Sequence, residues 1–86
     1  MFYYTYILLS KKDKGFYIGY TDNIKRRILE HNKGYVDSTK NRRPLEIVCF
    51  EGYKNRLIAM KREKYLKTGW GIRYLNKILA DAQICR

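Results

Sequence analysis

The sequence predicts an α+β fold, a sandwich of one sheet and helices with the element order ββαβαα. Two observations predict it: three short runs are rich in aromatic and β-branched residues, and three other segments repeat apolar residues at helical spacing. The 86 residues contain one proline and no internal repeat. We therefore expect residues 1–86 to form a single small domain around one core.

The first two predicted strands form a hairpin. Residues 3–9 and residues 16–20 are the two aromatic and β-branched runs near the amino terminus. Between them, the polar segment Lys11–Gly15 has the composition of a turn.

The middle of the chain predicts a helix and then a strand. Thr21–Asn23 offers several N-caps, and apolar residues recur at helical spacing from Ile24 until Gly34. A polar and basic stretch follows and closes at Pro44. Because residues 45–50 are apolar on nearly both faces, we expect this third strand to be buried.

The last third of the chain predicts two helices. Residues 55–68 form the first, which Gly69 can terminate, and residues 72–82 form a shorter second one. We expect Trp70, between them, to anchor the terminal helix rather than to stack on a base.

Composition excludes several protein classes. Nineteen Lys and Arg against 8 Asp and Glu give a net charge of +11, and 45% hydrophobic residues are too many for a disordered chain. The apolar run in residues 1–10 is too short to span a membrane. Cys49 and Cys85 match neither a disulfide framework nor a zinc site, so we expect a reduced, cytoplasmic location with both thiols inert. Such basicity favours polyanionic partners, nucleic acid first.

Tyrosine is frequent, with nine residues in the chain. Because side chains alternate along a strand, Tyr4 and Tyr6 share one face of the first strand, and Tyr17 and Gly19 share one face of the second. The hairpin register decides which of them meet, and it stays open. Half-buried packing is the ordinary role of a strand tyrosine, and a functional role needs a neighbour that activates the hydroxyl.

The first helix carries a second group of candidates. Arg27 and His31 are four residues apart and flank the apolar stripe of the helix, so they lie together at the edge of the core. Lys25 and Arg26 point elsewhere and form either a solvated face or a phosphate-binding surface.

Glu63 is the only acidic residue in its predicted helix. It shares a face with small and apolar residues, where an unpaired carboxylate is costly. Arg62 or Lys67 can pair with it. Alternatively it holds a divalent cation, since Mg²⁺ is commonly bound by one carboxylate with water and phosphate oxygens.

Taken in order, these residues resemble the GIY-YIG nuclease family. The resemblance runs from about residue 2 to residue 79 and is nearest to small stand-alone members; its motifs are Tyr4-Thr5-Tyr6, Tyr17-Ile18-Gly19, Asn23-Ile24-Lys25-Arg26-Arg27 with His31, and Arg62-Glu63. It implies a three-stranded antiparallel sheet flanked by helices. It also implies an endonuclease that hydrolyses DNA phosphodiester bonds with one divalent ion, Mg²⁺ or Mn²⁺.

The resemblance assigns roles to individual side chains. It implies that Tyr6 or Tyr17 helps to deprotonate the attacking water and that Arg27 stabilises the charge on the phosphate. Glu63 would bind the metal on the leaving-group side, and His31 would orient groups or touch the scissile phosphate.

Two further positions complete the comparison with the family. The first motif departs from Gly-Ile-Tyr, because Tyr4 stands where the family pattern has glycine. Asn76 is the nearest match to an asparagine that family enzymes place near the end of the domain.

Two functions of different classes follow from the sequence. The first is a metal-dependent endonuclease that acts on damaged, branched or single-stranded DNA, with an unidentified partner protein supplying target choice. The alternative is a non-catalytic module that binds nucleic acid through exposed aromatic residues and the four cations Lys25, Arg26, Arg42 and Arg43. A Glu63→Ala change separates the two, because cleavage needs this carboxylate and binding does not.

Overall fold

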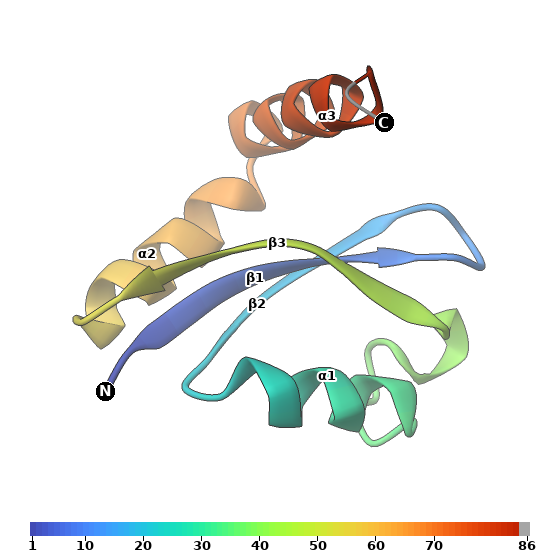
Figure 1. The fold of residues 1–86 in the computed structure, drawn as a ribbon, viewed down its shortest axis with the longest axis horizontal. Coiled ribbons are helices and arrows are strands. Elements are labelled where there is room, and N and C mark those ends of the chain that lie inside the picture. Colours follow the sequence, from blue (N-terminus) through green and yellow to red (C-terminus); the bar gives the residue numbers. More distant parts are fainter. Residues whose placement is uncertain (85–86) are drawn as a thin grey trace.

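A computed structural model describes residues 1–84, with side chains described through residue 78. The elements follow the predicted order ββαβαα (Figure 1): they are β1 (Tyr3–Ser10), β2 (Phe16–Thr21), α1 (Ile24–Asn32), the short 3₁₀ helix η1 (Lys40–Arg42), β3 (Leu45–Tyr53), α2 (Arg56–Leu66) and α3 (Gly69–Ile84). The predicted fold class is therefore confirmed.

The three strands form one antiparallel sheet in the order β2-β1-β3. The central strand β1 pairs with β2 through the predicted hairpin, and its register sets Tyr6 opposite Gly19 and Leu8 opposite Tyr17. On its other side, β1 places Tyr6 opposite Phe50 of β3. Helix α1 covers one face of the sheet, and α2 and α3 lie over the other (Figure 1).

Each face of β1 contributes to its own apolar cluster, because successive side chains point to opposite faces. On the α1 face, Tyr6 and Leu8 pack with Leu45, and Ile28 of α1 joins them. On the opposite face, Ile7 packs with Ile18 and with Leu66 and Leu75, which come from α2 and α3. The sheet thus separates two small layers of core.

The third strand is not buried, and that expectation is wrong. It lies at an edge of the sheet, and Leu45 is the only residue of β3 that is fully buried. The apolar pattern on both faces has a different cause, which is a shift of register opposite Ile7 and Leu8. There Val48 is an extra residue, as in a β-bulge, so that Val48 and Cys49 both pack toward the α2 face.

The junction of the last two helices also differs from the expectation. Gly69 does not terminate α2 but opens α3, three residues before the predicted start at Ile72. Thr68 explains the early start, because its carbonyl accepts from the Ile72 amide at 3.0 Å and its hydroxyl from the Gly71 amide at 3.3 Å. These bonds satisfy amides that otherwise lack partners at a helix start.

Trp70 does not anchor the terminal helix. Its side chain is 70% exposed and stacks under Arg73, whose guanidinium carbon is 5.1 Å from the ring centroid. Leu75, which is fully buried, fixes α3 to the sheet instead. Of the two cysteines, Cys49 packs beside the apolar cluster as expected, and Cys85 lies outside the described residues.

Within residues 1–84 no helix has the length and apolarity needed to cross a membrane.

Candidate active site

The Tyr6 side chain lies across the neighbouring strand at Gly19. A Cβ atom on Gly19 would be 2.6 Å from the Tyr6 hydroxyl oxygen and 2.8 Å from Cζ, both too close for real contacts. Only glycine therefore leaves room for the phenol, which is 1% exposed. The sequence shows that Gly19 shares a face with Tyr17, but this contact with Tyr6 depends on the register.

His31 connects the hydroxyl of Tyr6 to a second buried hydroxyl. Its Nε2 is 2.9 Å from Tyr6 Oη, and its Nδ1 is 2.7 Å from Thr39 Oγ1. Both His31 and Thr39 are fully buried. Burial, helped by the charge of Arg27, lowers the pKa of His31 to about 4. The imidazole is therefore neutral at neutral pH, with one nitrogen that donates and one that accepts.

Arg27 lies one helical turn before His31 and faces the same hydroxyl. Burial is the largest influence on the Tyr6 phenol and raises its pKa, whereas a hydrogen bond with Arg27 acts in the opposite direction. The guanidinium also pairs with Glu30, with Nη1 and Oε1 3.0 Å apart. Arg27 thus holds a half-buried positive charge beside the Tyr6–His31 pair.

Tyr17 completes this cluster on the α1 face of the sheet. Its ring centroid is 5.0 Å from that of His31 and 6.4 Å from that of Tyr6. The structure thus brings together four of the predicted site residues, namely Tyr6, Tyr17, Arg27 and His31.

Glu63 approaches from the other side of the sheet, on α2. Its negative charge raises the pKa of Tyr6, so the two groups are within electrostatic reach. Of the two predicted partners, Lys67 is the one that pairs with it, at 3.0 Å, while Arg62 binds Glu51 at 2.8 Å. The Lys67 side chain is 53% exposed, whereas that of Glu63 is 18% exposed, so the cation of this pair can move into solvent while the carboxylate stays in place.

The described residues contain no group of three or more His, Cys, Asp or Glu that could hold a metal ion. The Glu63 carboxylate is the donor that the sequence assigned to a metal ion. A single hard cation bound by the Glu63 carboxylate, with water and substrate phosphate oxygens as the other ligands, matches the usual coordination of Mg²⁺.

The four predicted nucleic-acid contacts have different surroundings. Lys25 and Arg43 are exposed, whereas Arg26 pairs with Asp22 at 2.9 Å. Arg42 is held in place, because Nε is 2.6 Å from the carboxylate of Asp13 and Nη2 donates to the Phe16 carbonyl. Arg42 therefore ties the hairpin turn to η1, and a phosphate contact by any of the four stays a prediction.

Asn76 lies on α3 with its side chain exposed. Within the described part of the chain no side-chain hydrogen bond joins it to the Tyr6 cluster, so its assignment to the site also stays a prediction.

Thr39 is the residue that sequence reasoning missed. It lies in a polar and basic stretch that has the composition of an exposed loop, yet it is fully buried. No local signal separates it from its neighbours. Its role follows only from its hydrogen bond with His31, eight residues earlier in the chain.

Residues 2–70 match the family model of the GIY-YIG catalytic domain. The chain belongs to the GIY-YIG family. A UPF0213 protein from Clostridium perfringens is 42% identical over 65 residues, which are 74% of this chain and 69% of that protein. A UPF0213 protein from Staphylococcus haemolyticus is 42% identical over 67 residues, 77% of this chain and 80% of that protein.

A solved structure supports the same assignment. The solution NMR structure of a UPF0213 protein from Bacillus halodurans has a TM-score of 0.57 and 31% identity, and it covers 91% of this chain and 85% of that chain. The predicted GIY-YIG membership and fold are thus confirmed, and this family implies a nuclease domain that binds nucleic acid.

Proposed function

We propose that this GIY-YIG protein is a metal-dependent endonuclease that hydrolyses DNA phosphodiester bonds, with single-stranded, branched or damaged DNA as its substrates. One observation carries the proposal: the hydroxyl of Tyr6 lies 2.9 Å from Nε2 of a buried, neutral His31 and beside the charge of Arg27. The net charge of +11 favours a polyanionic substrate.

The arrangement suits general base catalysis. A free phenol with a pKa near 10 is a poor base, and burial makes the tyrosinate of Tyr6 still less favourable. The hydrogen bond and the charge of Arg27 act against this and favour the tyrosinate, which takes a proton from the attacking water while the neutral His31 donates from Nε2 to the phenolate oxygen. Nδ1 of the neutral ring then accepts a hydrogen bond from Thr39 Oγ1, which fixes this tautomer.

The water oxygen forms a bond to phosphorus as the bond from phosphorus to one sugar oxygen breaks. Negative charge then builds on the non-bridging oxygens, where the guanidinium of Arg27 can stabilise it. Glu63 would hold the divalent ion. When bound, such an ion supplies positive charge to the phosphate and to the leaving oxygen.

Cleavage assays test the proposal. Labelled single-stranded, duplex, flapped and branched DNA, with matching RNA, is incubated with the protein in Mg²⁺, Mn²⁺ or EDTA. We expect cleavage of DNA only with a metal ion. Glu63→Gln and Tyr6→Phe should each lower the rate by about 100-fold or more, as expected for the loss of metal or general base catalysis.

The control for Glu63→Gln is Asp37→Asn. It removes the same charge from a side chain that is 97% exposed, and it should cleave at the wild-type rate. Binding that weakens with salt, with no cleavage in any metal, would overturn the proposal in favour of a non-catalytic nucleic-acid-binding module.

A further inference from the structure

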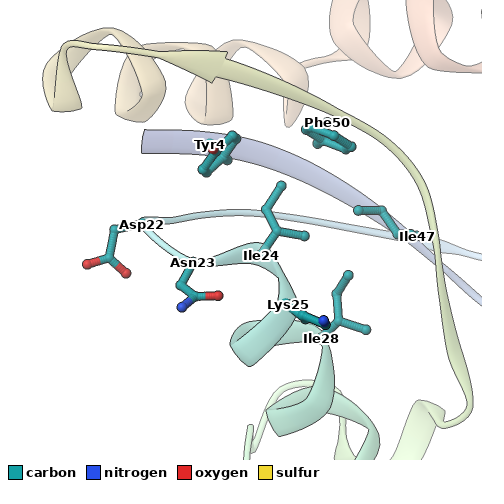
Figure 2. Close-up of a pocket in the computed structure, with 8 residues that line it drawn as sticks. All are labelled: Tyr4, Asp22, Asn23, Ile24, Lys25, Ile28, Ile47 and Phe50. Carbon is teal, nitrogen blue, oxygen red and sulfur yellow. The ribbon is translucent and has the colours of Figure 1, made fainter. Parts of the chain in front are cut away.

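An open groove of about 590 Å³ lies between the start of α1 and the sheet, apart from the Tyr6 cluster (Figure 2). Its volume is within the range of pockets that bind small organic groups, about 300–1,000 Å³. The apolar side chains of the groove come from all sides: Tyr4 of β1, Phe50 and Ile47 of β3, and Ile24 and Ile28 of α1.

Two aromatic rings form the sheet side of this groove. The rings of Tyr4 and Phe50 meet edge to face, with centroids 5.9 Å apart and an angle of 72°. Phe2 extends the row, with its centroid 6.4 Å from that of Tyr4. Phe50 is 56% exposed and Phe2 is 44% exposed, so large apolar faces are open to solvent beside the groove.

The β-bulge in β3 brings Phe50 to this face. Without the extra residue Val48, strict alternation would place Phe50 on the face opposite Leu45 and Ile47, toward α2. With the bulge, Phe50 stands opposite Tyr6 and next to Tyr4 on the α1 face.

The charges at the rim suit an anionic ligand. Lys25 borders the groove, and the carboxylate of Asp22, which also borders it, is paired with Arg26 at 2.9 Å. The chain as a whole carries +11. A planar ring on an anionic backbone is therefore a better match than an apolar peptide.

The groove is also close to the proposed site of cleavage. Tyr4 and Tyr6 are alternate residues of β1, about 6.6 Å apart along the strand and on the same face. Phe50 is the direct partner of Tyr6 across β1 and β3. The Tyr6 hydroxyl lies at Gly19 of β2 and the Tyr4 ring at Gly52 of β3, so a DNA strand that crosses the α1 face of the sheet can place a phosphate at Tyr6 and a base of the same strand at Phe50.

We propose that this groove binds an unpaired nucleobase of single-stranded DNA, stacked on the ring of Phe50 with its edge toward Tyr4, while Lys25 contacts a backbone phosphate. A paired base in a duplex is stacked between its neighbours and cannot enter without being flipped out. The groove therefore makes the protein selective for unpaired DNA. This inference rests on the proposed function only in taking DNA as the ligand.

Binding of fluorescent oligonucleotides in EDTA tests the inference without any cleavage. The probes are a dT 12-mer, the same length of abasic DNA backbone, a 12-base-pair duplex and a U 12-mer. We expect Phe50→Ala to weaken binding of the dT 12-mer by about 5- to 150-fold, the usual effect of losing one stacking partner. Binding to the abasic backbone and to the duplex should not change.

Two variants control for effects on binding that do not come from stacking on Phe50. Tyr35→Ala removes another aromatic ring that is 72% exposed and outside the groove, and it should bind all probes like the wild type. Phe50→Trp keeps a stacking surface and should restore tight binding of the dT 12-mer. The salt dependence of dT binding should be the same in Phe50→Ala and the wild type, because no phosphate contact is lost.

Two results would overturn the inference: equal losses on the dT and abasic probes, or no loss on the dT probe, which includes a loss confined to the U 12-mer. Its failure is distinguishable from that of the proposed function. Metal-dependent cleavage together with dT binding that does not depend on Phe50 refutes only the groove, whereas Phe50-dependent binding without any cleavage refutes only the enzyme.

Discussion

Replacing Gly19 by alanine tests whether the Tyr6 hydroxyl must stay where it is. The added Cβ would lie 2.6 Å from Oη, whereas ordinary contact begins at 3.4 Å, so the phenol must retreat by about 0.8 Å. It cannot do so freely, because Tyr6 is buried and bonded to His31. Overpacking of this kind costs about 1–3 kcal/mol of unfolding free energy. A displacement of about 1 Å at a reacting group costs about 100-fold in rate.

Urea unfolding and single-turnover cleavage measure the two effects on the same preparation. We expect Gly19→Ala to remain folded, to lose about 1–3 kcal/mol in stability and to cleave about 100-fold more slowly. The matched control is Gly69→Ala, where a Cβ meets nothing within 4 Å, and its stability should stay within about 0.5 kcal/mol of the wild type. A folded Gly19→Ala protein that cleaves at the wild-type rate would refute the reasoning.

The remaining predictions concern His31 and the basic loop. The pKa of His31 falls from 6.5 to about 4 on folding, so between these pH values only the unfolded chain binds the proton. This difference contributes up to about 3 kcal/mol to the free energy of unfolding. The contribution is complete above pH 6.5 and should be lost as the pH falls to 4. Urea titrations at pH 7 and pH 5 check this, and His31→Asn should show no such slope. Thr39→Val leaves Nδ1 of His31 without its partner and should lower the free energy of unfolding by about 1–3 kcal/mol in the same assay. An unchanged free energy of unfolding would contradict the role given to this hydrogen bond. Arg42→Ala should lower the urea midpoint and leave the salt dependence of DNA binding unchanged, because Arg42 holds the hairpin turn through Asp13. Arg43→Ala removes only an exposed hydrogen bond from Nε to the Lys40 carbonyl, so it should lower the midpoint less than Arg42→Ala does. It should reduce the slope of log Kd against log salt by about one, and the reverse pattern would exchange the roles of the two arginines.

The elements with local signals were predictable from the sequence. The hairpin follows from two apolar runs around a polar turn, and α1 begins after Asn23, whose side chain accepts from the Arg26 amide. It ends just before Gly34, which has a φ of +82° as a helix terminator requires. The helical spacing of Arg27 and His31 likewise predicted that the two would lie together.

The features that depend on pairing between distant segments were not predictable. One residue of register decides whether Tyr6 meets Gly19, and an extra residue at Val48 decides which face Phe50 takes. Because β1 is the central strand, β3 lies at an edge of the sheet, although the composition of β3 suits a buried strand. Composition also conceals Thr39, because its burial comes from the fold around His31 and not from its neighbours in sequence.

The two faces of the sheet limit where a phosphate can bind. Arg27 and His31 belong to α1 on one face, whereas Glu63 belongs to α2 on the other, and the charge of Glu63 still reaches Tyr6. The sheet itself lies between the two helices (Figure 1), so one phosphate can meet both Arg27 and Glu63 only around an edge strand. That strand is β2, because the Tyr6 phenol crosses it at Gly19. Gly19 is itself buried, and a glycine at this point of β2 is what lets the phenol reach the edge strand at all.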